Sequence, residues 1–239
     1  MNGQRPTALL AGATGLVGDH ILRELTSRVG ADGTPAYRSV TAVSRRRLVD
    51  ALGPGALDRS SGVQVREVRV DFTQLHQVAG DLEADHVFCA LGTTLRRARS
   101  KDRFRRVDFD HPLTLARLAL DAGARHFSLV SSIGANSRVR GFYLKVKGET
   151  EEALREVGYP SVSILRPSII GGPRRDSRPM EALGTALLSV APARWRTLHA
   201  RDVARCMVTL ALAEAPGVRV VESAEIRRIA RRGAPGRPR

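Results

Sequence analysis

The chain of 239 residues is long enough for one α/β domain with a large core and too short for two such domains. Its hydrophobic fraction of 42% and charged fraction of 26% are those of a globular protein, and they exclude a wholly disordered or fibrous chain. The net charge of +15 permits a polyanionic partner, but an aromatic fraction of only 4% argues against single-stranded nucleic acid, which needs stacking side chains.

Short apolar runs alternate along the chain with longer stretches of helical periodicity. Six runs predict strands, in chain order at residues 8–11, 40–44, 63–70, 86–91, 126–130 and 162–165. Helical spacing of apolar residues covers 19–29 and 110–122, and Gly30 and Gly123 follow where these helices should end. Apolar strands alternating with helices are typical of a parallel sheet buried on both faces. With right-handed crossovers, the simplest fold is a Rossmann-like, doubly wound α/β sheet with its ligand crevice at the carboxyl ends of the strands.

The alternation of apolar runs and helical periodicity becomes irregular after Gly171 and Gly172. Residues 173–179 predict a long loop, and 181–190 and 202–213 predict helices. We therefore expect a single NAD(P)-binding Rossmann domain over residues 1–225, in which residues 172–225 complete the substrate side. Residues 226–239 are rich in arginine, glycine and proline and predict a flexible basic tail.

Cysteine content and hydropathy bear on the compartment and on metals. Cys89 and Cys206 provide neither a disulfide framework nor metal-ligand spacing, so no metal site is expected. The apolar residues 7–11 run directly into a glycine motif and are expected to be a strand rather than a signal peptide. The apolar stretch 182–193 is well short of the ~20 residues that span a bilayer. We expect a cytoplasmic protein without membrane attachment.

A glycine motif lies between the first predicted strand and the first predicted helix. Gly12, Gly15 and Gly18 have the spacing of a dinucleotide-binding turn. Such a turn needs glycines because the chain bends sharply, the backbone approaches a pyrophosphate, and the helix packs closely on the sheet. The helix N-terminus then faces the phosphates. The position of the motif in the chain, more than its spacing, indicates a dinucleotide site.

Arginines follow the second predicted strand. An acidic residue at this position holds the ribose hydroxyls of NAD, whereas an arginine meets the 2′-phosphate of NADP. The chain has Arg45, followed by Arg46, so we expect NADP(H) to be preferred and NAD(H) to be possible. A solvated surface cluster is the alternative interpretation in a chain with 39 basic residues.

Tyr143 and Lys147 are four residues apart in a segment of helical pattern, so their side chains lie on one helix face. The ammonium of Lys147 can stabilise the phenolate of Tyr143 and hold a nicotinamide ribose, while Tyr143 exchanges a proton with a substrate oxygen. Ser132, with Ser131 as the second choice, ends the fifth predicted strand and can hydrogen-bond the same oxygen. A surface pair without chemistry and a serine that satisfies strand-end backbone groups are the alternatives.

Taken together, these motifs resemble the short-chain dehydrogenase/reductase superfamily in its atypical branch. The chain is similar in particular to the Tat-interacting-protein oxidoreductase family and its bacterial NAD(P)H-binding relatives. The resemblance covers roughly residues 7–180 and rests on residues 89–94, 106–108, 125–127, 131–135, 143–149 and 165–168. Many members of the superfamily have asparagine where this chain has Asp108, so a proton relay through that position is not expected.

The resemblance implies an NADPH-binding Rossmann fold with Ser132, Tyr143 and Lys147 as catalytic residues. It also implies a set of residues around the dinucleotide. Those residues are Thr14, Leu16 and Val17 at the phosphate turn, Asp71 and Phe72 beside the adenine, Leu91 and Gly92 under the cofactor, and Pro167, Ser168 and Ile169 at the nicotinamide.

The leading hypothesis is an NADP(H)-dependent oxidoreductase that acts on a small carbonyl or alcohol substrate. The alternative is a non-catalytic NADP(H)-binding regulatory protein, because a fold does not by itself establish turnover. A nucleic-acid partner is the third hypothesis and is disfavoured. Only Lys101, Lys145 and Lys147 are lysines, so arginine supplies the charge, a bias that a GC-rich coding sequence produces without selection for binding. The sequence predicts neither the substrate nor the oligomeric state.

Overall fold

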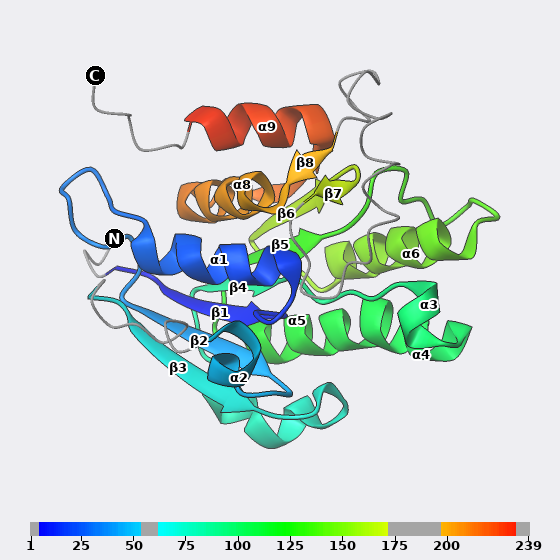
Figure 1. The fold of residues 1–239 in the computed structure, drawn as a ribbon, viewed down its shortest axis with the longest axis horizontal. Coiled ribbons are helices and arrows are strands. Elements are labelled where there is room, and N and C mark those ends of the chain that lie inside the picture. Colours follow the sequence, from blue (N-terminus) through cyan, green and yellow to red (C-terminus); the bar gives the residue numbers. More distant parts are fainter. Residues whose placement is uncertain (1–4, 54–61, 172–196, 233–239) are drawn as a thin grey trace.

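Seven parallel strands form the centre of the protein in a computed structural model that describes residues 5–53, 62–171 and 197–232 (Figure 1). The sheet contains β1 (Thr7–Ala11), β2 (Ser39–Ser44), β3 (Gln64–Arg69), β4 (His86–Cys89), β5 (His126–Val130), β6 (Ser161–Arg166) and β9 (Gly217–Glu222). Two further strands, β7 (Ile170–Gly171) and β8 (Leu198–His199), form a small parallel pair.

The helices of the described residues follow the strands in the alternation that the sequence predicts. They are α1 (Leu16–Ser27), α2 (Leu48–Leu52), α3 (Leu95–Ala98), α4 (Lys101–Arg105), α5 (His111–Asp121), α6 (Phe142–Glu156), α8 (Ala200–Ala213) and α9 (Ser223–Arg232). A 3-10 segment, η2 (Phe72–Asp81), follows β3, and a π-helical turn, η3 (Arg106–Asp110), joins α4 to α5.

The strand order is β3-β2-β1-β4-β5-β6-β9, and every neighbouring pair is parallel. The chain runs outward in one direction from β1 to β3 and in the other direction from β4 to β9. The order therefore reverses between β1 and β4, and at such a switch point the loops diverge and leave a crevice for a ligand.

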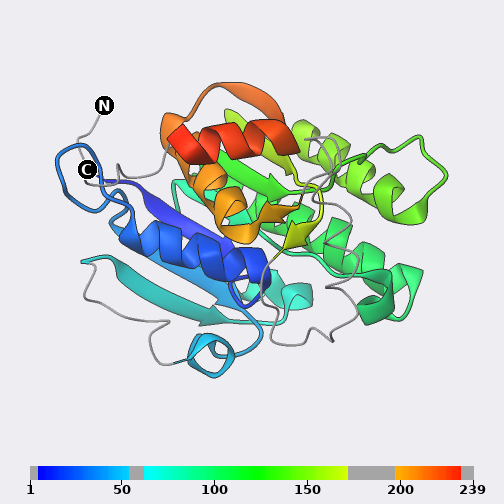
Figure 2. The ribbon, with the colours of Figure 1, turned by 45° about the horizontal axis from the view of Figure 1, so that its top comes forward.

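Two apolar layers cover the two faces of the sheet. Helices α1, α8 and α9 bury Ile21, Val203 and Ile226 in one core, and they lie side by side in both views (Figures 1 and 2). On the other face, α5 and α6 bury Leu115 and Leu154 with the residues of η2. Covering both faces excludes water from the strands, which explains their continuous apolar runs.

Local signals position α5. Pro112 lies in its first turn, where the missing N–H would have no partner within the helix. Gly123 follows its end with φ of +96°, a left-handed conformation that glycine adopts without steric cost. Both signals are readable in the sequence, and the helix lies where the periodicity predicts it.

The six predicted strands and the Rossmann-like fold are confirmed, and two expectations about the C-terminal part are wrong. No strand was predicted at β9, because the side chains of this edge strand are mostly exposed and give little apolar signal. The predicted tail at 226–239 does not begin at 226, because residues 223–232 form α9 and bury Ile226 and Ala230. The predicted loop at 173–179, the predicted helix at 181–190 and the end of the tail lie outside the described residues. None of the helices that the structure describes is long and apolar enough to cross a membrane.

Candidate active site

The register of the sheet brings the predicted site residues to one edge. Ala11 pairs with Val43 on one side and with Cys89 on the other. Cys89 in turn pairs with Leu129, and Leu129 with Ile164. The carboxyl ends of β1, β2, β4, β5 and β6 therefore lie in one row, and the loops that follow them, with all of the motifs described above, start along it. We call this row the carboxyl edge.

The glycine turn after β1 has no room for a side chain at Gly12 or at Gly18. Gly12 has φ of +92°, and a Cβ there would lie 2.7 Å from the backbone carbonyl of Ala90, in the loop after β4. A Cβ on Gly18 would lie 1.9 Å from the Gly12 oxygen. Gly15 is the exposed N-cap of α1. Thr14, Leu16 and Val17 occupy the rest of the turn, with Val17 buried. Such a cradle at a helix N-terminus fits a dinucleotide pyrophosphate.

Arg45 and Arg46 are exposed directly after β2. Arg45 is close enough to Asp71 and His111 to lower the pKa of each, although the largest causes are a backbone hydrogen bond from Thr73 for Asp71 and burial for His111. Phe72 is buried, with its ring 5.7 Å from that of His111. The structure thus gathers one arginine, one carboxylate and two rings where the sequence predicts the adenosine part of the cofactor.

Lys147 is buried on α6 and ion-paired. Its Nζ lies 2.8 Å from Oδ1 of Asp108 and donates to the backbone oxygen of Val130, at the end of β5, at 3.4 Å. A Cβ on Gly92 would lie 3.4 Å from the same Asp108 oxygen and 3.7 Å from the Lys147 nitrogen. The pair therefore lies directly under the loop in which Leu91 and Gly92 are expected to pass beneath the cofactor.

The charge of Lys147 is maintained despite its burial. Burial alone lowers the pKa of a lysine, but the Asp108 carboxylate raises it, and so does the phenol of Tyr143. The resulting pKa of Lys147 lies above its ordinary value, so the ammonium stays protonated. An ammonium has three donors, and the structure shows one of them in a hydrogen bond, to the Val130 oxygen.

Tyr143 lies one helical turn before Lys147 and is half-buried, with its ring 5.5 Å from the buried Phe104. The two candidate serines differ clearly. Ser131 is buried and donates to Oε1 of Glu151 at 2.5 Å, whereas Ser132 is only partly buried and donates to the carbonyl oxygen of Ile133 at 3.3 Å. The geometry therefore favours Ser132 as the serine that faces a substrate and gives Ser131 a structural part.

The sequence reading missed the group that holds Ser131. Glu151, one turn after Lys147 on α6, is 2% exposed. Its carboxylate accepts three hydrogen bonds from Arg166, two from Nε at 3.0 and 3.2 Å and one from Nη2 at 2.6 Å. Arg166 ends β6 and also pairs with Glu222 of β9 at 3.2 Å. This network ties α6 to the ends of β5, β6 and β9. Spacing could have indicated it, because Glu151 continues the face of α6 that carries Tyr143 and Lys147.

The loop after β5 and the segment after β6 also meet at the carboxyl edge. Ile133 donates its N–H to the carbonyl oxygen of Pro167 at 3.0 Å, and the N–H of Ser168 donates to Ser223 at 2.5 Å. Pro167 and Ser168 are buried, while Ile169 is 49% exposed. An exposed apolar side chain beside the predicted nicotinamide position is consistent with its expected place in the site.

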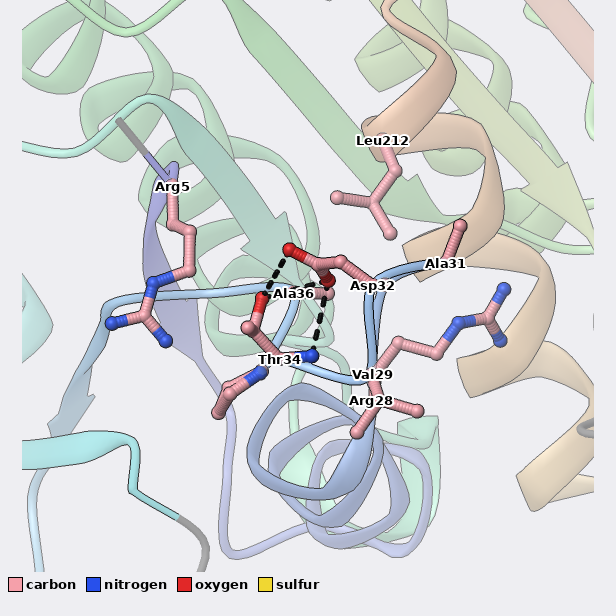
Figure 3. A pocket seen from close by; sticks show the side chains of 10 residues that line it. Arg5, Arg28, Val29, Ala31, Asp32, Thr34, Ala36 and Leu212 are labelled. Carbon is pink, nitrogen blue, oxygen red and sulfur yellow. Dashed lines mark hydrogen bonds between the residues drawn. The ribbon is translucent and has the colours of Figure 1, made fainter. Parts of the chain in front are cut away.

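A cavity in the described part of the chain lies away from this edge. A cavity of about 420 Å³ is lined by residues around the turn after α1, including Arg5, Asp32 and Thr34 (Figure 3). These residues precede β1 and β2, so the cavity lies at the amino ends of the strands. Figure 3 shows Asp32 accepting hydrogen bonds from Thr34, which close the turn. Within the described parts of the chain, no group of three metal-ligating side chains converges.

Comparisons with known proteins identify the family of this chain. Residues 8–155 match the NAD dependent epimerase/dehydratase family. The chain is 33% identical over 201 residues to Protein HTATIP2 of Rattus norvegicus, and the aligned region covers 84% of this chain and 77% of that protein. It is 35% identical over 179 residues to the protein named fmp52, mitochondrial, of Emericella nidulans, over 73% of this chain and 71% of that one. The expected likeness to the Tat-interacting-protein family is confirmed.

Solved structures show the same fold at low sequence identity. A short-chain type dehydrogenase/reductase from Mycobacterium ulcerans superposes with a TM-score of 0.70 and 18% identity, over 95% of this chain and 91% of that one. The dTDP-glucose 4,6-dehydratase DesIV from Streptomyces venezuelae, with NAD bound, gives 0.69 and 18%, over 95% and 79%. Because the family match covers more than half of the chain and the relatives exceed 30% identity, this protein belongs to the NAD dependent epimerase/dehydratase family.

Proposed function

We propose that this protein is an NADP(H)-dependent oxidoreductase of the atypical short-chain dehydrogenase/reductase type that acts on a small carbonyl or alcohol. The observation that carries the proposal is the buried ammonium of Lys147, which is held under Gly92 one turn after Tyr143. A buried ion pair is costly to maintain, and a structural role alone would be served as well by apolar side chains. Such perturbed groups cluster at functional sites.

The residues that would hold the dinucleotide lie along the carboxyl edge. Gly12, Gly15 and Gly18 would receive the pyrophosphate at the start of α1. A remaining donor of Lys147 would reach the hydroxyls of the nicotinamide ribose. The remaining contacts are those implied by the family resemblance, from Asp71 and Phe72 at the adenine to Pro167, Ser168 and Ile169 at the nicotinamide.

In the direction of reduction, a bound NADPH would supply the hydride for the carbonyl carbon of the substrate. Ser132 donates a hydrogen bond to the carbonyl oxygen and orients it. Tyr143 donates its phenolic proton to that oxygen, which yields the alcohol and leaves a phenolate. The Lys147 ammonium stabilises the phenolate, and solvent then restores the proton. The oxidation of an alcohol uses the same groups in reverse.

The preference for NADP(H) depends on Arg45 and Arg46, and a fluorescence titration with NADPH and NADH tests it. We expect Arg45→Ala to weaken NADPH binding by about tenfold or more, because a charge-assisted bond to the 2′-phosphate is lost, and to leave NADH binding unchanged. Arg47→Ala is the matched control, since Arg47 is also exposed and lies two positions after Arg45. Equal binding of both dinucleotides by the unmodified protein would contradict the preference.

Turnover is tested by following NADPH absorbance with a panel of small aldehydes and ketones. Tyr143→Phe should abolish NADPH oxidation and leave NADPH affinity intact, because it removes only the hydroxyl. If the protein binds NADPH but oxidises none across the panel, the alternative of a non-catalytic NADP(H)-binding regulator replaces this proposal. The expected cytoplasmic location stays a prediction, and the Emericella nidulans relative carries the word mitochondrial in its name.

A further inference from the structure

Asp108 contacts two other segments of the site, α6 and the loop of Thr93, through three of its atoms. Its Oδ1 pairs with Nζ of Lys147 at 2.8 Å, and its Oδ2 accepts the backbone N–H of Thr93 at 2.9 Å. Its backbone oxygen accepts the hydroxyl of Thr150, on α6, at 2.9 Å. The side chain of Asp108 is fully buried. One carboxylate thus connects the helix that carries Tyr143 and Lys147 with the loop of Gly92 and Thr93.

A carboxylate is the side chain that fits these partners. Both groups that approach Asp108 are donors, and each meets a different oxygen. An asparagine has one acceptor oxygen, and its amide nitrogen would face either the Lys147 ammonium or the Thr93 N–H, donor against donor. The departure from the asparagine of many superfamily members therefore has a physical reason in this chain.

The backbone around Asp108 is also unusual. Asp108 lies in the π-helical turn η3, between α4 and α5. Such turns are rare and are found mostly at functional sites, because the extra residue redirects a side chain that a regular helix would place differently. Here the turn presents the Asp108 carboxylate to Lys147.

We propose that Asp108 is a positioning residue that holds the Lys147 ammonium under the loop of Gly92 and Thr93, so that the lysine meets the nicotinamide ribose in one orientation. This inference rests on the proposed function, because it assumes that a dinucleotide crosses that loop. Asp108 then acts on the cofactor through Lys147 and not by its own contact.

Charge and position predict opposite effects of removing the carboxylate. If Asp108 acted only through its charge, its neutralisation would favour an anionic dinucleotide, and NADPH would bind more tightly. If it holds Lys147 in place, its neutralisation frees the ammonium to adopt other orientations, and NADPH binds more weakly. The direction of the change in affinity therefore separates the two roles.

The experiment compares Asp108→Asn with the unmodified protein by fluorescence and calorimetric titration of NADPH and of 2′,5′-ADP, which lacks the nicotinamide ribose. We expect NADPH to bind about tenfold more weakly and 2′,5′-ADP to bind within about twofold of the unmodified protein. Asp110→Asn is the matched control, because Asp110 carries the same charge two residues along η3 and is exposed. It should leave both affinities within about twofold.

Unchanged or tighter NADPH binding by Asp108→Asn would overturn the inference, and so would an equal loss of affinity for both ligands, which indicates a general structural defect. If Asp108→Asn does not fold, Lys147→Met and the double variant Lys147→Met/Asp108→Asn carry the test. These two should bind NADPH equally, whereas a further loss in the double variant would show that Asp108 acts independently. A protein that binds neither NADPH nor NADH would instead refute the proposed function.

Discussion

Replacing His126 by asparagine should make the protein less sensitive to acid. His126 begins β5 and is 1% exposed. Its Nδ1 shares a hydrogen bond with Ser161 at 2.8 Å, and its Nε2 lies 2.9 Å from Ser128 and 3.1 Å from Ser163. The second buried histidine, His86, lies with its ring 5.8 Å away. Within the described part of the chain, the hydrogen-bond partners of the His126 ring are serine hydroxyls, which accommodate a neutral imidazole.

Burial, and then the neighbouring His86, lower the pKa of His126 from 6.5 to about 3. In the unfolded chain the imidazole takes up a proton as the pH falls below 6.5, whereas in the folded chain it stays neutral until about pH 3. The unfolded state therefore binds more protons in this window, and stability is lost as the pH falls through it. Between about pH 8 and pH 5 the unfolded state gains about 2 kcal/mol from this one group.

Urea unfolding at the two pH values, followed by circular dichroism, measures this loss. The free energy of unfolding of His126→Asn should fall by about 2 kcal/mol less than that of the unmodified protein over the interval. Other groups that titrate in this interval, such as His20 and His111, whose pKa burial lowers from 6.5, contribute in both proteins and cancel in the comparison. His76→Asn, at an exposed histidine, should behave as the unmodified protein does. An equal loss in the His126 variant would refute the assignment of a buried neutral imidazole.

Three further outcomes follow from the geometry. Gly18→Ala should lose dinucleotide binding and lower the melting temperature, because its Cβ would lie 1.9 Å from a backbone oxygen, while Gly80→Ala, with nothing within 4 Å, should do neither. Lys147→Met should cost ~3 to 5 kcal/mol in urea unfolding by leaving Asp108 buried and unpaired, and the double variant with Asp108→Asn should recover part of that loss; additive losses would contradict a coupled pair. The Cys89 thiol, whose pKa burial raises to about 12, should resist Ellman's reagent at pH 8 until the protein is unfolded, and rapid labelling of the native protein would contradict its burial.

Local patterns were sufficient to predict six strands of the sheet and to locate the motifs of the candidate site. The central strands were predictable because both of their faces are apolar. The glycine turn was predictable because close backbone approach requires glycines at a fixed spacing. Tyr143 and Lys147 were predictable together, since helical periodicity alone places them one turn apart. The edge strand β9 and the helix α9 were not predicted, because exposed positions interrupt their apolar patterns and arginines dominate α9.

The sequence by itself determined six strands of the sheet and their order along the chain, the glycine turn after β1 and the helix face that carries Tyr143 and Lys147. These features depend on neighbours in the chain, where sterics and periodicity act over a few residues. Only the tertiary structure showed that Ser131 is held by Glu151, which lies 20 positions away in the chain, and that Ser132 is not. It also brought Asp108 together with Thr93 and Lys147, which come from two other segments. Burial favours such long-range pairs because it removes water as a hydrogen-bond partner. Each buried donor or acceptor must then be paired with another group of the protein.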